Sequence, residues 1–156
     1  MERKDAEAAE VAKDFLQELR TAYDGTSTRR EVSPRVNALS HAVIGAAIEV
    51  HRHLGPGFAE TVYEKALAME LHSRGTPFQC QAPIEVAYKG TPIWTGRIDL
   101  LVEMLVVELK SVDAVSTLHR AQLHSYLKAG AYPLGLILNF NVRLMKDGIH
   151  RVVLKS

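Results

Sequence analysis

The largely apolar stretch from Gly96 to Ser111 contains Asp99, Glu108 and Lys110, charged residues that lie within or at the ends of its two apolar runs. If the chain turns at Glu103-Met104, two antiparallel strands result, and counting outward from the turn sets Asp99 opposite Glu108. Directly opposed residues on such strands point to the same side of the sheet. Lys110 lies two residues beyond Glu108 and shares that face, because side chains alternate along a strand. The spacing therefore predicts that two carboxylates and one ammonium group converge on one patch of the sheet.

Two opposed carboxylates repel each other unless a positive charge lies between them. A divalent metal ion supplies this charge well, because hard cations prefer oxygen ligands. A lysine beside the metal can orient a water molecule or stabilise a charged transition state. The alternative is a surface salt bridge, in which Lys110 neutralises Glu108 while Asp99 begins a strand at the sheet edge. The apolar residues around the charges favour a functional site, since charges set into buried strands are usually paired or functional.

Hydrophobic spacing predicts the elements that position these residues. Apolar residues at helical intervals predict three helices in the main part of the chain, over residues 36–54, 58–74 and 115–129. Glycines at 55–57 end the first helix, and Gly75 ends the second.

The strands are predicted from β-rich segments bounded by turn residues. Residues 83–102 predict two strands joined by a turn at Lys89-Gly90, followed by the strand pair around Glu103-Met104. Residues 133–140 predict a buried strand, and residues 142–154 predict a hairpin with a type I′ turn at Asp147-Gly148. This order of helices and strands predicts an α/β fold, a mixed sheet with helices packed on it.

The length of 156 residues suits one domain, and 47% hydrophobic with 24% charged residues is typical of a globular protein. Residues 1–33 hold six Lys/Arg and eight Asp/Glu, a balance of −2, whereas residues 34–156 have a balance of +3. Residues 24–34 are rich in Gly, Ser and Thr, which predicts a linker. We therefore expect an amphipathic N-terminal helix over residues 5–22 with its linker, and a main domain over residues 34–156.

The lone cysteine, Cys80, excludes a disulfide within the chain and fits a reducing compartment, so a cytoplasmic protein is expected. We interpret Cys80 as a small, inert core residue. The first ten residues are polar and charged, unlike a secretory signal, and no apolar run approaches the roughly 20 residues needed to cross a bilayer. No membrane partner is expected, and the net charge of +1 neither favours nor excludes an anionic partner.

A further motif, Gly57-x-x-Glu60-x-x-Tyr63, lies within "LGPGFAETVYEKAL". It resembles the signature of the GxxExxY proteins, a branch of the PD-(D/E)XK nuclease superfamily. The similarity extends over about residues 39–154, through "AAIEVHRHLGPG", "GRIDLLVE", "VVELKSV", "AQLHSYLKAG", "GLILNFN" and "KDGIHRVV". The resemblance implies a mixed sheet flanked by helices, with the active site on the central hairpin.

The resemblance also implies roles for individual residues. Asp99 matches the acidic residue of the first core strand, and Glu108 with Lys110 matches the ExK motif of the next. Glu60 matches the helical glutamate that completes the carboxylate cluster. One or two Mg²⁺ or Mn²⁺ ions would be held by Asp99, Glu108, the carbonyl of Leu109 and Glu60, with Lys110 positioning the attacking water. Glu60 could instead only favour the helix dipole, as we expect for Glu64.

Four residues are predicted to meet the substrate. Gln122 and Tyr126 match the Q-x-x-x-Y motif of RecB-type nucleases and share one helix face, since they are four residues apart. They would contact the substrate strand or brace Lys110. Tyr63 should share a face with Glu60, and Arg97 could meet a phosphate. The alternatives are core packing for the two tyrosines and a plain surface role for Arg97.

The sequence therefore predicts a metal-dependent nuclease acting on nucleic acid, with DNA as the expected substrate and single-stranded or frayed ends preferred. The competing prediction is a binding module for nucleic acid or protein that keeps the fold without turnover, and a hydrolase of RNA or small molecules is the third. The His51-x-His53 motif could suggest zinc, but the two residues point about 200° apart on a helix. We interpret them as helix-cap and surface residues.

Overall fold

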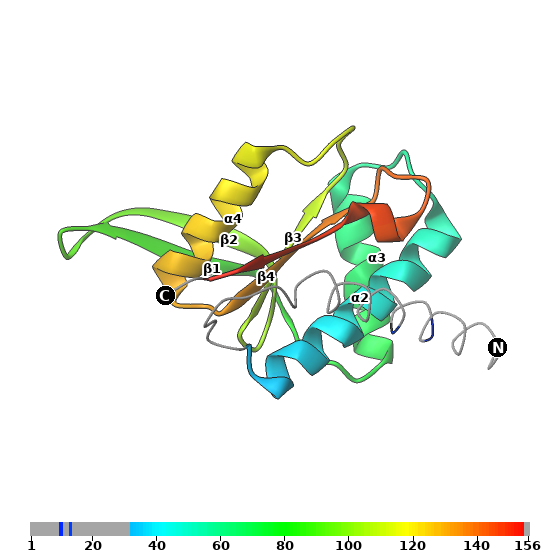
Figure 1. Ribbon diagram of the computed structural model, residues 1–156, viewed down its shortest axis with the longest axis horizontal. Helices are drawn as coiled ribbons and strands as arrows, with labels where there is room; N and C mark the ends of the chain where they lie inside the picture. Colours follow the sequence, from blue (N-terminus) through cyan, green and yellow to red (C-terminus); the bar gives the residue numbers. More distant parts are fainter. Residues whose placement is uncertain (1–9, 11–12, 14–31, 155–156) are drawn as a thin grey trace, which may run out of the picture.

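The computed structural model describes Glu10, Lys13 and residues 32–154. The described chain forms one sheet with helices α2 (Pro34–Leu54) and α3 (Glu60–Ser73) on one face and α4 (Thr117–Gly130) on the other (Figure 1). The predicted α/β architecture is confirmed. The helix predicted over residues 5–22 lies outside the described residues, apart from Glu10 and Lys13, which are helical and exposed.

The sheet has five strands in the order β1-β2-β3-β4-β5. Only the β3–β4 pair is parallel, with α4 as the crossover between its strands, and the other three pairs are antiparallel. The outer strand β1 is long and contains Pro83, and Figure 1 shows the β1–β2 hairpin reaching beyond the rest of the sheet. The strand bounds are β1 (Gln79–Tyr88), β2 (Thr91–Val102), β3 (Leu105–Lys110), β4 (Leu134–Asn139) and β5 (Ile149–Val153).

The helix ends carry the residues that the backbone requires there. The Ser33 hydroxyl accepts a hydrogen bond from the backbone N–H of Val36, which caps α2 before Pro34. Gly55 then ends α2 with a left-handed φ of 67°. Ser116 forms a capping box with His119 at the start of α4. The three helices begin and end within two residues of their predicted positions.

Both predicted turns around the second strand are present. Lys89 and Gly90 have φ values of 48° and 81°, so both central residues are left-handed, as a type I′ turn requires. The second turn, at Glu103-Met104, sets Val102 opposite Leu105. The Arg35 guanidinium donates to both carboxylate oxygens of Glu103, at 3.0 and 2.7 Å, and so fastens this turn to the start of α2.

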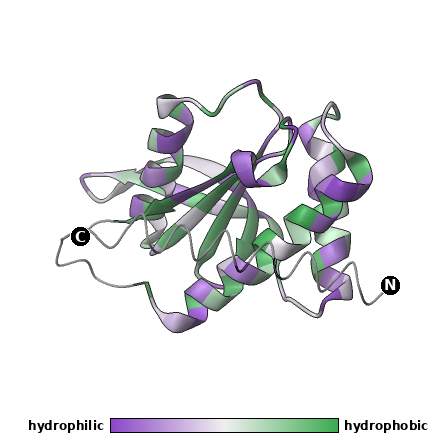
Figure 2. Ribbon diagram, turned by 45° about the vertical axis from the view of Figure 1, so that its right-hand side comes forward, coloured by the Kyte–Doolittle hydropathy of each residue, from purple (hydrophilic) through white to green (hydrophobic). Residues whose placement is uncertain are grey.

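The apolar core consists of two clusters, one on each face of the sheet. The larger cluster lies under α2 and α3, where the rings of Tyr63 and Phe140 stack with centroids 4.5 Å apart. The smaller cluster lies under α4 and includes Leu123 and Leu127. In Figure 2 the central strands are coloured hydrophobic, while the helices carry hydrophilic residues on the sides turned away from them. Each helix thus covers the sheet with one apolar face.

Two predictions are wrong. Residues 142–154 do not form a hairpin, because Met145–Gly148 is a short 3₁₀ helix and the following strand, β5, pairs with β4. A Cβ on Gly148 would lie 1.9 Å from the carbonyl oxygen of Asn139, so this glycine permits a close backbone approach rather than a turn. Cys80 is exposed on the outer strand β1 and does not belong to the core.

Within the described residues, no helix combines the length and the apolar character needed to cross a membrane.

Candidate active site

The candidate active site lies where the pairing between β2 and β3 ends. Backbone pairing runs from the turn as far as Leu100 and Val107. Beyond that point, the backbone N–H of Asp99 donates to Glu108 Oε1 at 3.2 Å, and the N–H of Leu109 donates to Asp99 Oδ2 at 2.9 Å. Each carboxylate thus accepts a hydrogen bond from a backbone N–H of the other strand. The structure brings Asp99 and Glu108 together, as the count outward from the turn predicted.

The strand β2 changes faces at Asp99. Ile98 packs in the cluster under α4, whereas Leu100 packs in the cluster under α2 and α3. Regular alternation would put these two side chains on the same face. The neighbouring strand is irregular at the same level, because Gln81 has a left-handed φ of 52° and the pairing passes from Cys80–Leu100 to Ala82–Ile98. The irregularity in both strands sets the Asp99 side chain at the junction of the two faces.

Gln81 links the site to helix α3. Its side-chain nitrogen donates to Glu64 Oε1 at 2.8 Å and lies 3.5 Å from Asp99 Oδ1, while Arg97 Nη1 donates to the Gln81 carbonyl oxygen at 3.4 Å. Glu64 is therefore connected to Asp99 through an amide, which the interpretation of Glu64 as a helix-dipole residue missed. No sequence pattern marks Gln81, because its role depends on a left-handed backbone that the residue type does not demand.

The two carboxylates interact strongly. Burial and, after it, the negative charge of Asp99 raise the pKa of Glu108 to about 8, against the opposing positive charge of Lys110. Burial also raises the pKa of the Tyr126 hydroxyl, with a further contribution from the charge of Glu108. Glu108 therefore retains a proton at neutral pH unless a cation compensates the pair.

Lys110 lies at the end of β3, half-buried and on the same side as Glu108. Its carbonyl oxygen accepts a hydrogen bond from the N–H of Phe140 at 3.0 Å, which fixes the backbone at this point. Within the described part of the chain, its ammonium group forms no ion pair. The amine thus influences Glu108 through its charge and remains available to another group.

Gln122 and Tyr126 lie one turn apart on α4 and interact with each other, since Gln122 Nε2 donates to the Tyr126 hydroxyl at 3.3 Å. The Tyr126 ring also lies beside Trp94 of β2. Nothing in the sequence marks Trp94 as a neighbour of this site, because β2 and α4 are far apart along the chain and only the fold brings the two rings together.

Glu60 is not brought into this cluster. It is the first residue of α3 and is exposed, and no hydrogen bond joins it to Asp99 or Glu108. Among the residues that the structure describes, no group of three or more His, Cys, Asp and Glu side chains is arranged to hold a metal ion. The carboxylate pair without Glu60 is thus the assembled part of the predicted cluster.

Tyr63 does not face a substrate in this arrangement. Its ring is fully buried against Phe140, its hydroxyl donates to the carbonyl oxygen of Gly55 at 2.6 Å, and it accepts from the N–H of Phe58 at 3.2 Å. Tyr63 is therefore a core residue, as the alternative prediction stated, and its hydroxyl holds the loop between α2 and α3 in place. The predicted substrate contact from Tyr63 is corrected accordingly.

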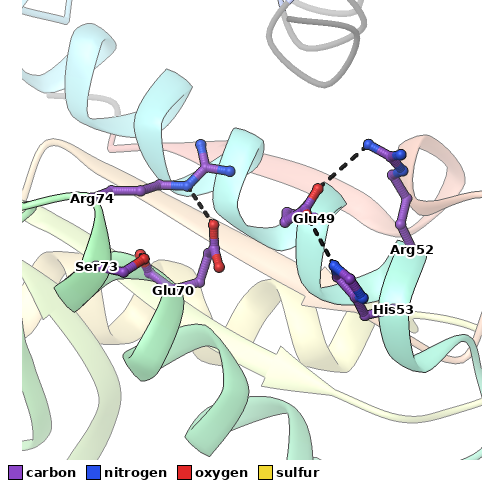
Figure 3. Close-up of polar contacts among 6 residues, drawn as sticks. All are labelled: Glu49, Arg52, His53, Glu70, Ser73 and Arg74. Atoms are coloured by element: carbon purple, nitrogen blue, oxygen red, sulfur yellow. Dashed lines mark hydrogen bonds and ion pairs between the residues drawn. The ribbon is translucent and has the colours of Figure 1, made fainter. Parts of the chain in front are cut away.

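The two histidines of the H-x-H motif have separate partners. His53 Nε2 lies 2.8 Å from Glu49 Oε1, beside the Arg52–Glu49 contact, and Figure 3 shows these side chains next to the Glu70–Arg74 pair of α3. His51 is instead buried, with Nε2 2.8 Å from the carbonyl oxygen of Val142. The surface role is correct for His53 and wrong for His51.

The residues present fit a hard divalent cation. Asp99 Oδ2 and Glu108 Oε1 each accept a backbone N–H, and among the described residues Asp99 Oδ1 has only the 3.5 Å contact with Gln81 Nε2, so oxygen lone pairs of both acids remain for a cation. Carboxylate oxygens are the ligands that Mg²⁺ and Mn²⁺ prefer, and a cation would offset the repulsion that raises the pKa of Glu108.

The fold and the site together define the class of protein: a mixed α/β sheet that presents Asp99 and the Glu108-x-Lys110 pair on adjoining strands. Residues 37–152 match the family model described as "PD-(D/E)XK nuclease superfamily", so the chain belongs to this superfamily. Membership indicates a nuclease-type function with nucleic acid as substrate, and nucleases of this superfamily generally use divalent metal ions.

Two further comparisons complete this result. No curated protein matches the chain. One similar solved structure is titled "Crystal structure of SSO0001"; it is 16% identical, the match covers 91% of this chain and 75% of that one, and the TM-score is 0.44. A likeness at this level carries no argument about function.

Proposed function

We propose that this protein is a divalent-metal-dependent nuclease of the GxxExxY type that hydrolyses phosphodiester bonds in DNA, and that it acts in the cytoplasm. The observation that carries the proposal is the burial of Glu108 against Asp99, with Lys110 two residues further along β3. Two carboxylates in contact are costly to keep inside a sheet without a cation to hold. The lone cysteine, which permits no disulfide within the chain, supports the compartment.

The metal ion would be held by Asp99, Glu108 and the carbonyl of Leu109, with Glu60 reaching it through water. When bound, such an ion lowers the pKa of a water molecule and neutralises charge on the scissile phosphate. The backbone N–H of Leu109 fixes the Asp99 carboxylate, and the N–H of Asp99 fixes Glu108. These two hydrogen bonds hold both acids in place before any ligand arrives, which preorganises the site.

Lys110 has a separate task in this mechanism. Its amine forms no ion pair within the described residues, so it can donate to the attacking water or to a phosphate oxygen. Gln122 and Tyr126 supply further donors on the α4 side, and Arg97, exposed on β2, supplies a positive charge for a neighbouring phosphate. DNA is the proposed substrate because the Gln122-x-x-x-Tyr126 pair resembles the motif of RecB-type nucleases.

A binding module without turnover is the second candidate. The position of Glu60 favours it, since this glutamate is exposed and forms no hydrogen bond with the carboxylate pair. The two candidates differ in one respect that can be measured, namely whether metal binding is accompanied by cleavage.

The test combines Mn²⁺ calorimetry with cleavage of labelled DNA. Asp99→Asn and Glu108→Gln should each reduce Mn²⁺ affinity by more than the roughly 10- to 100-fold that loss of an outer-shell partner costs. Glu85→Gln is the matched control, because Glu85 is an exposed carboxylate on β1. Lys110→Ala should abolish cleavage while Mn²⁺ still binds.

Two outcomes would contradict the proposed nuclease function. Unchanged Mn²⁺ affinity in both Asp99→Asn and Glu108→Gln would remove the metal site. Normal Mn²⁺ binding without cleavage of single-stranded, blunt duplex or supercoiled DNA would favour the binding module.

A further inference from the structure

An exposed aromatic pair lies beside the candidate active site. Trp94, the only tryptophan of the chain, lies on β2 with its ring nearly parallel to that of Tyr126 on α4, at an interplanar angle of 19° and a centroid distance of 6.1 Å. Trp94 is 48% exposed. A tryptophan that served only to pack the hairpin against α4 would gain more by burial, because its large apolar ring is stabilised in proportion to the area removed from water.

The backbone of β2 makes room for this indole. A Cβ on Gly96 would lie 2.0 Å from the nearest ring carbon of Trp94, so the ring occupies the space that a side chain at position 96 would take. The indole therefore lies along its own strand instead of projecting from it. Its orientation next to Tyr126 depends on a glycine two residues away.

Tyr126 connects the indole with the carboxylates. Its hydroxyl accepts a hydrogen bond from Gln122, and its ring packs against the apolar cluster under α4. Val106 of β3 belongs to that cluster, and Glu108 follows it two residues further along the strand on the same face. Tyr126 therefore lies on the face of the sheet that carries Glu108 and contacts Trp94 there.

We propose that Trp94 and Tyr126 form a stacking subsite for an unpaired base of the strand that is cut. The proposal rests on the function proposed above, and names its substrate as single-stranded or frayed DNA. An aromatic side chain stacks on any base, so the subsite needs no sequence preference. A base within a duplex is already stacked between its neighbours and must first be exposed at an energetic cost. The flat, partly exposed indole beside a phosphodiester-cleaving site suits the unpaired base.

The single tryptophan provides a direct test. The full chain carrying Lys110→Ala, with Mn²⁺ present, is expected to bind DNA without cutting it, and it retains Trp94 as its only indole. A short oligodeoxythymidylate should quench the tryptophan fluorescence, because a stacked base contacts the ring. An abasic strand of equal length and a blunt duplex should quench it much less. Equal quenching by the oligodeoxythymidylate and the abasic strand, or none by either, would overturn the proposal.

Variants extend the test to affinity, measured by the anisotropy of a labelled oligodeoxythymidylate. Trp94→Ala should weaken binding of the single strand on the order of tenfold, the scale of one lost stacking contact, and leave duplex binding unchanged. Trp94→Phe should restore much of the loss. Ile93→Ala is the control, because Ile93 is an apolar neighbour on the hairpin with 64% exposure, whereas the ring contact with Tyr126 is made by Trp94. Equal affinity in Trp94→Ala and Ile93→Ala would also overturn the subsite.

Cleavage separates this proposal from the proposed function. Mn²⁺-dependent cutting of single-stranded DNA at the parent rate by Trp94→Ala would keep the nuclease and remove the subsite. Quenching by single-stranded DNA in a parent protein that cuts no substrate would keep the subsite and remove the nuclease.

Discussion

The two faces of the sheet are built for different purposes. Under α2 and α3 the side chains form one large apolar cluster, in which Tyr63 and Phe140 stack and even the tyrosine hydroxyl has two partners. Under α4 the apolar cluster is smaller, and the same face also carries Glu108, Lys110 and the Trp94–Tyr126 pair. The α2/α3 face therefore stabilises the fold through apolar packing. On the α4 face, charged side chains occupy part of the area that apolar residues could fill.

The strand β3 shows this division within six residues. Leu105, Val107 and Leu109 point to the α2/α3 cluster, whereas Val106 points to the α4 cluster and Glu108 follows it on the same side. A continuous apolar strand could have filled both faces. A carboxylic acid in the place of one of these side chains puts the proposed site on the α4 face.

The largest expected effect is on the stability of the α2/α3 face. Phe140→Ala should lower the free energy of unfolding by about 3–5 kcal/mol, because it removes a fully buried ring and the stack with Tyr63. Urea denaturation measures this loss. Tyr88→Ala, an exposed aromatic of the β1–β2 hairpin, is the control and should stay within about 0.5 kcal/mol of the parent. An equal loss of unfolding free energy in both variants would contradict the stabilising role assigned to the α2/α3 face.

A second effect, which depends on pH and is smaller within any one pH unit, is expected on the α4 face of the metal-free protein. The Glu108 pKa is about 8 in the folded state against 4.5 as its ordinary value. Between these values the folded protein binds a proton that the unfolded chain has released, so stability falls as pH rises, by at most about 1.4 kcal/mol per pH unit. Glu108→Gln should remove this slope and be more stable than the parent above pH 8. The measurement is urea unfolding across the pH range.

The control for that series is Glu85→Gln. Glu85 is exposed, so this substitution should leave the pH dependence of stability as it is in the parent protein. Added Mn²⁺ should reverse the trend in the parent, since a metal that requires the ionised acids stabilises the folded state more as pH rises. Parallel pH profiles for the parent and Glu108→Gln would show that the buried acid is not the source of the slope.

The smallest effect is expected from removing the N-terminal segment. Among the residues that the structure describes, those from 32 onward make both apolar clusters, and we propose that a chain beginning at Val32 folds as a unit and binds Mn²⁺ like the full chain. A cooperative urea transition with an unchanged midpoint is the expected result. Loss of cooperativity would show that the segment before Val32 belongs to the α2/α3 face.

Local rules made much of the fold predictable from the sequence. The glycine at position 55 predicted the end of α2, and the glycine of Lys89-Gly90 predicted the turn between β1 and β2, so each boundary follows from its own neighbours. The juxtaposition of Asp99 and Glu108 was predictable for the same reason, because only a two-residue turn separates their strands.

The errors arose where contacts distant in sequence decide the structure. Asp147-Gly148 has the composition of a hairpin turn, yet a glycine is needed at 148 because the backbone carbonyl of Asn139 leaves no room for a Cβ. Cys80 is apolar enough for a core, but it lies on an outer strand. The left-handed Gln81 and the contact of Trp94 with α4 depend on partners that no periodicity reveals.

The outer strand β1 has a consequence for how copies of this protein meet. An edge strand offers a row of unpaired N–H and C=O groups on which another extended chain can assemble. In β1 that row is interrupted by the left-handed backbone of Gln81 and by Pro83, which has no N–H to donate. Within the described residues, these two breaks make the first half of the β1 edge a poor template for a further strand, so we expect little edge-to-edge pairing between copies there.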